Sequence, residues 1–170
     1  MTTETKKTTP KKTVTPNDPL RPSRVTPIVI DATNLVVGRM ASLVAEQLLK
    51  GAAITIVNTE KAVFTGNTKP LVQRWQTRLD LRAKGTPEHA PRFHKTPDRI
   101  VREIVEGMVP SRVERGQNAM RRLKTLIGVP LNVKKETLQT LEKAKNTKTK
   151  GITSVLELSR ALGYNQIVKG

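Results

Sequence analysis

The sequence predicts an α/β domain in which helices and strands alternate around a small parallel sheet. Residues 28–31 and 54–57 are short runs of β-branched residues, a pattern typical of buried strands. A stretch with helical apolar periodicity lies between them. A strand, a helix and a second strand at this spacing form a βαβ unit, which implies a parallel pair joined by a right-handed crossover.

The chain is predicted to divide into three parts. Residues 1–27 are dominated by Thr, Lys and Pro, and the repeated prolines prevent regular structure, so we interpret them as a disordered basic arm. Residues 28–130 contain the alternating elements and form the predicted α/β domain. Residues 131–170 are interpreted as a Lys-rich linker followed by a C-terminal helix.

The first helix is predicted over about 38–50, with Gly51 placed to end it. Its apolar residues recur at the spacing of one helix face: Met40, Leu43, Val44 and Leu48. After the strand at 54–57, residues 62–65 are a candidate third strand. A second helix is predicted over about 69–83, and its buried face carries Leu71, Val72, Trp75 and Leu79.

The remaining elements follow a loop over 84–97 that is rich in Pro, Gly and basic residues. Thr96 as N-cap and Pro97 as first residue open another helix. Its apolar stripe is Ile100, Val101, Ile104, Val105 and Met108, with Pro110 as its end. A helix over 117–124 and a short strand at 126–127 come next.

The last predicted helix begins with a capping box, in which Ser154 precedes Glu157 by three residues. Val155, Leu158 and Leu162 share one face of this helix. Gly163 is placed to end it.

The charge of the chain predicts a polyanionic partner. Lys and Arg number 31 against 14 Asp and Glu among 170 residues, so the formal net charge is +17. Residues 61–95 carry a net charge of +6, and residues 1–27, 112–124 and 125–150 carry +4 each, whereas residues 28–60 carry −1. Clusters of Lys and Arg bind phosphate backbones and release counterions. A basic coat that serves only solubility is the weaker alternative, because acidic residues increase solubility more effectively.

Several classes of protein are disfavoured by composition. The chain has no Cys, which excludes a disulfide scaffold, a Cys-ligated zinc site and a thiol nucleophile. With only two His, we expect no metal and no cofactor. No apolar run is long enough to span a membrane, and the N-terminus lacks the apolar region of a secretory signal. We therefore expect a cytoplasmic protein with neither a membrane partner nor a small-molecule substrate.

The rival function is a nucleotide-using α/β enzyme with a degenerate phosphate turn at Gly38. A dinucleotide fold needs several glycines in that turn, and only Gly38 is present. Asp31 and Glu60 could form a paired-carboxylate site at the strand ends. Capping, or ion pairing with Arg39 and Lys61, is the stronger interpretation of these carboxylates. We therefore expect no catalytic residues and no enzymatic activity.

Two clusters of arginine favour RNA binding. Arg74, Arg78 and Arg82 recur every four residues and form a ridge along the second helix. Such like charges repel one another, so an external anion would stabilise the ridge. The second cluster flanks Gly116 and comprises Arg112, Arg115, Arg121, Arg122 and Lys124. A solvated helix face remains the alternative for any single residue.

Arg39 stands in the first turn of its helix, where it could share a phosphate with backbone N–H groups. An ion pair with Asp31 or Glu60 is the alternative. Phe93 and Tyr164 are the only free aromatic candidates, so contacts to phosphates and RNA shape are favoured over base stacking. The full set of predicted RNA-contact residues is Arg39, Lys61, Lys69, Arg74, Arg78, Arg82, Lys84, Arg92, His94, Lys95, Arg112, Arg115, Arg121, Arg122 and Lys124.

Four short blocks occur in order along residues 28–130. The first block comprises Asp31-Ala32, Asn34-Leu35 and Gly38 to Ser42, and the second comprises Val57-Asn58, Glu60 to Ala62 and Thr65 to Asn67. The third block comprises Pro97 to Ile100 and Gly107 to Pro110. The fourth block comprises Arg115-Gly116, Ala119, Arg122 to Lys124 and Ile127 to Pro130. Together they resemble the large-subunit ribosomal protein thirteen family in its archaeal and eukaryotic form. Residues 153–163 resemble the archaeal-type C-terminal helix of that family.

The resemblance implies a three-layer α/β/α domain around a four-stranded parallel sheet. It also implies a structural constituent of the large ribosomal subunit. Such a protein would bind large-subunit ribosomal RNA and lie beside neighbouring large-subunit proteins.

Overall fold

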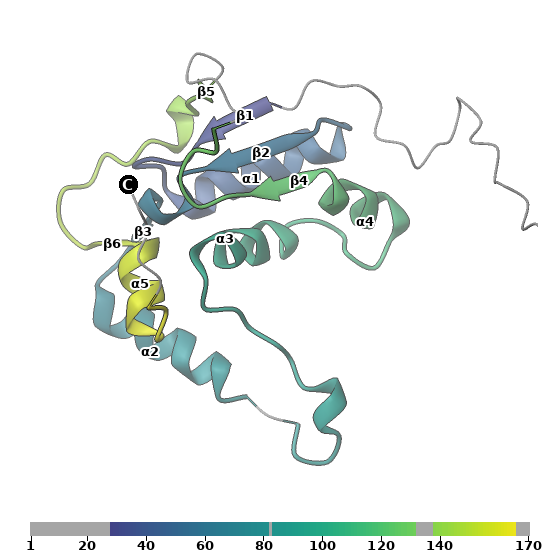
Figure 1. Cartoon of the computed structure of the whole chain (residues 1–170), viewed down its shortest axis with the longest axis vertical. Coiled ribbons are helices and arrows are strands. Elements are labelled where there is room, and N and C mark those ends of the chain that lie inside the picture. Colours follow the sequence, from purple (N-terminus) through teal and green to yellow (C-terminus); the bar gives the residue numbers. More distant parts are fainter. Residues whose placement is uncertain (1–27, 82, 132–137, 166–170) are drawn as a thin grey trace, which may run out of the picture.

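The computed structural model describes residues 28–81, 83–131 and 138–165. The predicted disordered arm, residues 1–27, and the predicted RNA contact Arg82 lie outside these residues. The predicted three-layer α/β class with a four-stranded parallel sheet is confirmed. Figure 1 shows the sheet at the top of the molecule, with α3 (Pro97–Glu106), α5 (Val155–Ala161) and α2 (Thr68–Leu79) below it.

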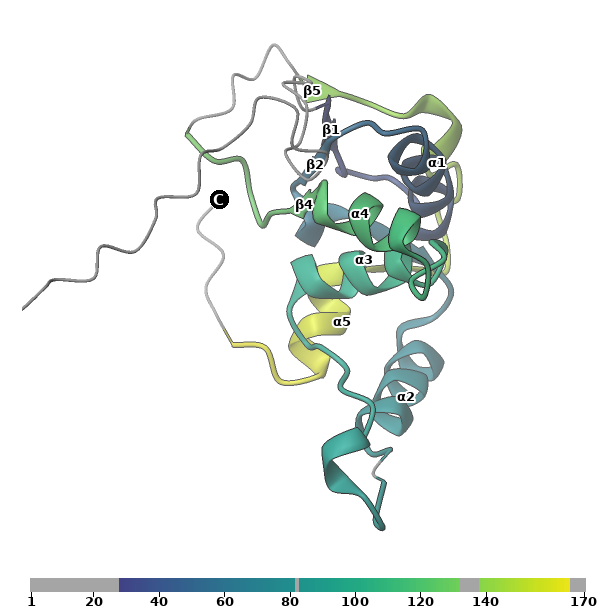
Figure 2. The same cartoon turned by 90° about the vertical axis from the view of Figure 1, so that its right-hand side faces the viewer.

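The main sheet contains β1 (Ile28–Asp31), β2 (Ile54–Val57), β4 (Leu123–Thr125) and β5 (Leu138–Gln139). Its strand order is β4-β2-β1-β5, and every neighbouring pair is parallel. The predicted βαβ unit is confirmed, with α1 (Val37–Leu49) connecting β1 to β2 and covering one face of the sheet (Figures 1 and 2). All four residues of β2 are buried, as an interior parallel strand requires.

Residues 62–65 do contain a strand, but it belongs to a second sheet. β3 (Val63–Thr65) pairs antiparallel with β6 (Ile152–Ser154). Two backbone hydrogen bonds extend this pairing, from the amide of Gly66 to the carbonyl of Gly151 (2.7 Å) and from the amide of Val155 to the carbonyl of Ala62 (2.9 Å). The partner strand lies almost ninety positions along the chain, so this pairing is decided by tertiary contacts.

The predicted strand at 126–127 is wrong in position, because β4 lies three residues earlier. Leu123 pairs in register with Ile54 and is buried in the core. The helix predicted over 117–124 is displaced in the same direction. It is α4 (Glu114–Arg121).

The second and third helices are shorter than predicted. α2 (Thr68–Leu79) ends before residue 83. α3 (Pro97–Glu106) ends before Met108, which is 43% exposed instead of completing the apolar stripe. Thr96 and Pro97 occupy the predicted N-cap and first position, but the Thr96 hydroxyl is buried without a hydrogen-bond partner among the described residues.

In the part of the chain that the structure describes, short 3₁₀ turns lie between these elements at Thr59–Lys61, Pro87–His89 and Glu142–Ala144. The last helix, α5 (Val155–Ala161), has the predicted capping box: Ser154 accepts from the amide of Glu157, whose carboxylate accepts from the amide of Ser154. Gly163 follows this helix with a positive φ of 95°.

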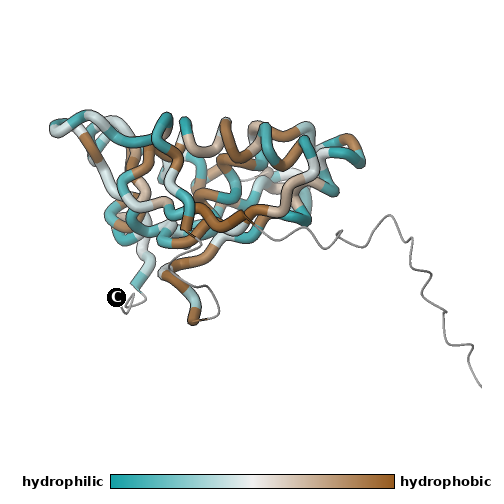
Figure 3. The backbone as a smooth tube through the Cα atoms, turned by 90° about the horizontal axis from the view of Figure 1, so that it is seen from above, coloured by the Kyte–Doolittle hydropathy of each residue, from teal (hydrophilic) through white to brown (hydrophobic). Residues whose placement is uncertain are grey.

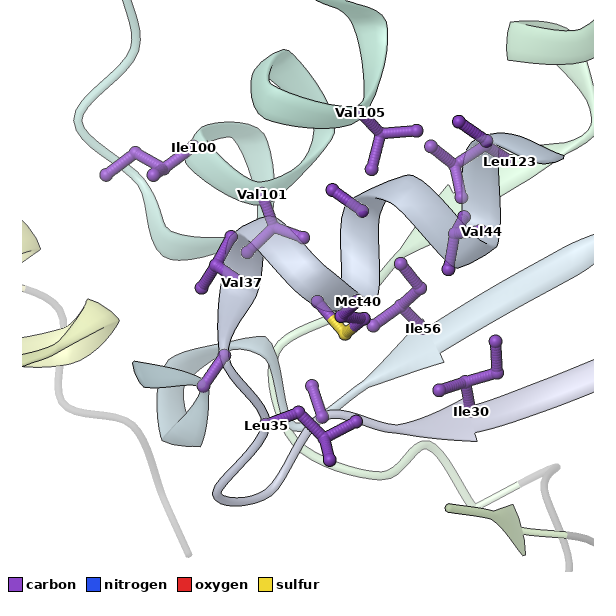
Figure 4. Close-up of a cluster of buried hydrophobic side chains, with 14 of the residues drawn as sticks. Ile30, Leu35, Val37, Met40, Val44, Ile56, Ile100, Val101, Val105 and Leu123 are labelled. Atoms are coloured by element: carbon purple, nitrogen blue, oxygen red, sulfur yellow. The ribbon is translucent and has the colours of Figure 1, made fainter. Parts of the chain in front are cut away.

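One hydrophobic core joins the sheet to the helices. In Figure 4, Met40 and Val44 of α1 lie among Ile56 of the sheet and Val101 and Val105 of α3. The helices contain both apolar and polar residues, so Figure 3 shows brown (hydrophobic) and teal (hydrophilic) positions along each of them. Each helix turns its apolar residues toward this shared interior.

The C-terminal segment contributes to the same core. β5 pairs with β1, and Val155, Leu158 and Leu162 are buried among the residues that line the interior. Residues on both sides of position 130 therefore share one hydrophobic core. The division into a 28–130 domain and a separate C-terminal part stays a prediction about independent folding.

Candidate nucleic-acid interface

The first basic surface is a projection formed by α2 and residues 83–96. Both Figure 1 and Figure 2 show this projection extending away from the main sheet. The predicted contact residue His94 is half-buried on this projection. The other described contact residues are exposed: Lys69, Arg74, Arg78, Lys84, Arg92 and Lys95. We call this surface the α2 projection.

Packing within α2 and contacts with α5 hold the α2 projection in place. Trp75 is 3% exposed and is the one residue of α2 that is fully buried. The guanidinium carbon of Arg78 lies 5.2 Å from the centroid of the Trp75 ring, within the range of a cation–π contact. At the other end, the hydroxyl of Ser159 donates a hydrogen bond to the carbonyl of Lys95. The cations of the projection are therefore presented from a packed base.

The second basic surface, the α4 surface, comprises Arg112, Arg115, Arg121 and Lys124, which are all exposed. Gly116 allows α4 to lie directly against the end of the preceding segment. A Cβ atom on Gly116 would stand 2.0 Å from the carbonyl oxygen of Pro110. This close approach determines where Arg112 and Arg115 emerge. The α4 surface and the α2 projection are separate in both Figure 1 and Figure 2.

Arg122 differs from the other members of its sequence cluster because its side chain turns into the fold. Its Nη2 atom donates a hydrogen bond to the carbonyl oxygen of Leu48 at 2.8 Å, and the residue is half-buried. Arg102 has a similar structural role, donating to the carbonyls of Met120 and Leu123. Contact between Arg122 and RNA stays a prediction.

Replacing Arg122 with alanine is expected to lower the free energy of unfolding by about 1–3 kcal/mol, because the Leu48 carbonyl loses a charged donor. The neighbouring Arg121→Ala variant is the matched control and should change stability by about 0.5 kcal/mol or less. Urea unfolding followed by the fluorescence of Trp75 measures both. Equal effects of the two variants would contradict the structural role of Arg122.

A third basic group lies near the carboxyl ends of β1 and β2. Arg39, in the first turn of α1, and Lys61 are both exposed. Within the described residues Arg39 forms no ion pair, so the alternative in which it pairs with Asp31 or Glu60 is wrong. Val36, the N-cap of α1, provides no side-chain cap. The first amide groups of α1 are therefore left for another acceptor.

The two carboxylates at these strand ends hold loops together. Asp31 accepts hydrogen bonds from the Thr33 amide (3.0 Å), the Thr33 hydroxyl (2.7 Å) and the Asn58 side chain (2.9 Å). Burial raises the pKa of Asp31, but these hydrogen bonds and the charge of Lys61 outweigh it, so the pKa lies below its ordinary value. Glu60 is buried and accepts from the amide of Gly128 at 3.0 Å. Both carboxylates are thus structural acceptors.

The aromatic candidates behave differently from one another. Tyr164 is 9% exposed, so the prediction that it is a free aromatic side chain is wrong. Phe93 is partly exposed and lines a cavity beside α3. After Gly163 the backbone turns back, and the amide of Tyr164 donates a hydrogen bond to the carbonyl of Ser159.

Few charges in the described ranges are neutralised internally. The single ion pair found there joins Lys50 to Glu46 on α1. Those same ranges contain no group of three or more His, Cys, Asp or Glu residues arranged to hold a metal ion. None of their helices has both the length and the apolar character needed to cross a membrane.

Comparison with known proteins agrees with this arrangement. The family model described as ribosomal protein L13 matches residues 25–132. A protein of Thermoplasma volcanium named large ribosomal subunit protein uL13 is 38% identical, over 79% of this chain and 97% of its own. Proteins of the same name from Archaeoglobus fulgidus and Methanosarcina barkeri are 37% and 45% identical, over 82% and 62% of this chain and 89% and 74% of their own. The chain belongs to the ribosomal protein L13 family.

Proposed function

We propose that this protein is a structural constituent of the large ribosomal subunit in the cytoplasm, where it binds large-subunit ribosomal RNA and neighbouring ribosomal proteins without catalysing a reaction. The observation that carries the proposal is the set of exposed cations on the α2 projection and the α4 surface. None of these cations has an ion-pair partner among the described residues. The names of the relatives support the same conclusion.

Phosphate contacts explain why such cations are left unpaired. Each Lys or Arg that neutralises a phosphate releases counterions, which favours binding entropically at low salt. The α2 projection extends its cations beyond the core, so they can reach an RNA surface that a flat face could not follow. The α4 surface supplies a second group of contacts at a separate place.

Arg39 supports a third contact. The uncapped amide groups at the start of α1 favour an anion, and the exposed Gly38 leaves open space beside them. An RNA phosphate at this place would accept hydrogen bonds from the amides and from the Arg39 guanidinium together.

Co-sedimentation tests the assembly itself. Tagged protein expressed in an archaeal cell should migrate with the large subunit in a sucrose gradient. Protein that stays at the top of the gradient would contradict the proposal. Equilibrium binding of ATP or NAD to the purified chain would instead favour the rival, a nucleotide-using enzyme with a phosphate turn at Gly38.

Replacing Arg115 with glutamine is expected to weaken RNA binding and to reduce the slope of log affinity against log salt by about 1, because one phosphate contact is lost. Lys50→Gln is the matched control, since Lys50 is already paired with Glu46. Fluorescence anisotropy of a labelled ribosomal RNA fragment at several salt concentrations measures both. An unchanged slope for Arg115→Gln would place Arg115 outside the RNA contact.

A further inference from the structure

A cavity of about 710 Å³ lies between the α2 projection and α3. Its lining includes Trp75, Arg78, Phe93, Glu103, Ile104 and Met108. A smaller cavity of about 330 Å³ shares Trp75, Arg78 and Ile104 with it and also contains Arg74. The volume of the larger cavity falls within the range of small-ligand sites.

The walls of the larger cavity expose apolar surface that the described chain does not cover. Leu81 and Met108, which both line it, are 51% and 43% exposed. Large exposed apolar side chains gathered at one hollow mark a place where another molecule packs. Phe93, from the loop of the α2 projection, adds an aromatic ring to the same lining.

Glu103, which is half-buried, supplies a carboxyl group to this lining. Its Oε2 atom is buried and has no hydrogen-bond partner among the described residues. Burial raises the pKa of Glu103, although the backbone of His94 and the charge of Arg78 act in the opposite direction. The terminal torsion of Glu is broad and roughly two-fold, so the carboxylate can turn an acceptor toward the cavity.

Arg78 supplies a flat surface. Its guanidinium carbon lies 5.2 Å from the centroid of the Trp75 ring, and this cation–π contact holds the planar group in place. Because Arg78 also lines the cavity, the guanidinium is available to a second planar molecule. Unpaired RNA bases stack on aromatic rings and on Arg planes in this way.

We propose that this cavity takes a single unpaired nucleobase of an RNA strand. The base stacks against Arg78 and Phe93, and an amino or imino N–H of the base donates a hydrogen bond to Glu103. This inference rests on the proposed RNA-binding function and names the part of the RNA that enters the α2 projection. Adenine, cytosine and guanine, which carry amino groups, suit the acceptor best.

The charge around the cavity favours RNA over a protein segment. The lining itself carries Arg78 together with Glu103 and Glu106, and Arg74 lines the adjoining smaller cavity. Arg92 and Arg112 are the chain neighbours of the lining residues Phe93 and Ser111, so the cations surround the cavity. These cations can hold the phosphates on either side of an inserted base. A basic protein segment would meet repulsion from these surrounding cations.

The test compares hexaadenylate with an abasic hexamer of equal phosphate number, each titrated into the full-length protein at low salt. Trp75 is the only tryptophan of the chain, so its fluorescence reports directly on the cavity. Hexaadenylate is expected to bind roughly tenfold more tightly than the abasic hexamer, because it adds base stacking. It should also quench Trp75, and the abasic hexamer should not.

Two conservative variants separate the cavity from general phosphate binding. Arg78→Lys keeps the charge but loses the flat guanidinium, so it should abolish the tenfold preference while retaining binding of the abasic hexamer. Glu103→Gln should reduce the preference several-fold. Arg160→Lys on α5 and Glu114→Gln on α4 change exposed residues outside the predicted RNA contacts, so they are the matched controls and should retain it in full.

Equal affinity for the two hexamers, with no change in Trp75 fluorescence, would overturn the proposal and leave the cavity to a protein partner. That result can occur while the protein still co-sediments with the large subunit, so the two proposals can fail separately. A preference that persists in Arg78→Lys would also overturn it, because the base would then be bound elsewhere.

Discussion

Replacing Gly116 with alanine is expected to lower the free energy of unfolding by about 3 kcal/mol. The added Cβ would lie 2.0 Å from the carbonyl oxygen and 2.6 Å from the carbonyl carbon of Pro110, which are both backbone atoms. Alanine normally stabilises a helix relative to glycine by about 1 kcal/mol, but here the clash outweighs that gain. Relieving it requires α4 to move, and α4 carries the buried Ala119 and Met120.

Gly38→Ala is the matched control, because a Cβ at Gly38 would meet nothing within 4 Å. This variant is expected to retain its stability or gain up to about 1 kcal/mol. Urea unfolding monitored through Trp75 fluorescence measures both variants. Similar stabilities for the two would show that the approach of α4 to Pro110 is not tight in solution.

Replacing Leu158 with alanine is expected to lower the free energy of unfolding by about 2–5 kcal/mol. Leu158 is fully buried in the core that the sheet and α1 share, and α5 packs against α2 and α3. Removing its side chain leaves a cavity where these elements meet. Because α5 supports the base of the α2 projection, the midpoint of unfolding should fall for the whole molecule.

Leu156→Ala, in the same turn of α5, is the control for helix propensity because Leu156 is only half-buried. It should lose less than half as much stability as Leu158→Ala. Chemical unfolding followed by circular dichroism gives both values. A negligible effect of Leu158→Ala would show that residues 28–130 fold without the C-terminal helix, as the division drawn from the sequence predicts.

Short sequence patterns were sufficient to predict the βαβ unit and the start of α5. The βαβ unit follows from two β-branched runs and one helical stripe, and the start of α5 follows from the capping box at Ser154. These features depend on residues within a few positions of one another, which periodicity and capping rules describe directly. The family resemblance, carried by the four sequence blocks, implied that the sheet has four strands.

The candidate interface was also predictable in part. Clusters of Lys and Arg are visible in the sequence, and the structure describes most of them as exposed. The sequence could not show that Arg122 turns into the fold while its neighbour Arg121 stays exposed. Both are arginines in one cluster, and only the position of the Leu48 carbonyl distinguishes them.

The amino-acid sequence by itself determined the class of the fold, the βαβ unit, the family and the location of the excess charge. The tertiary structure decided that β3 pairs with β6, that Tyr164 is buried, and that α2 and α3 border an open cavity beside Trp75. The physical reason is the range of the interactions. Composition and periodicity record what each segment prefers, whereas pairing, burial and cavities depend on segments that meet only after the chain has folded.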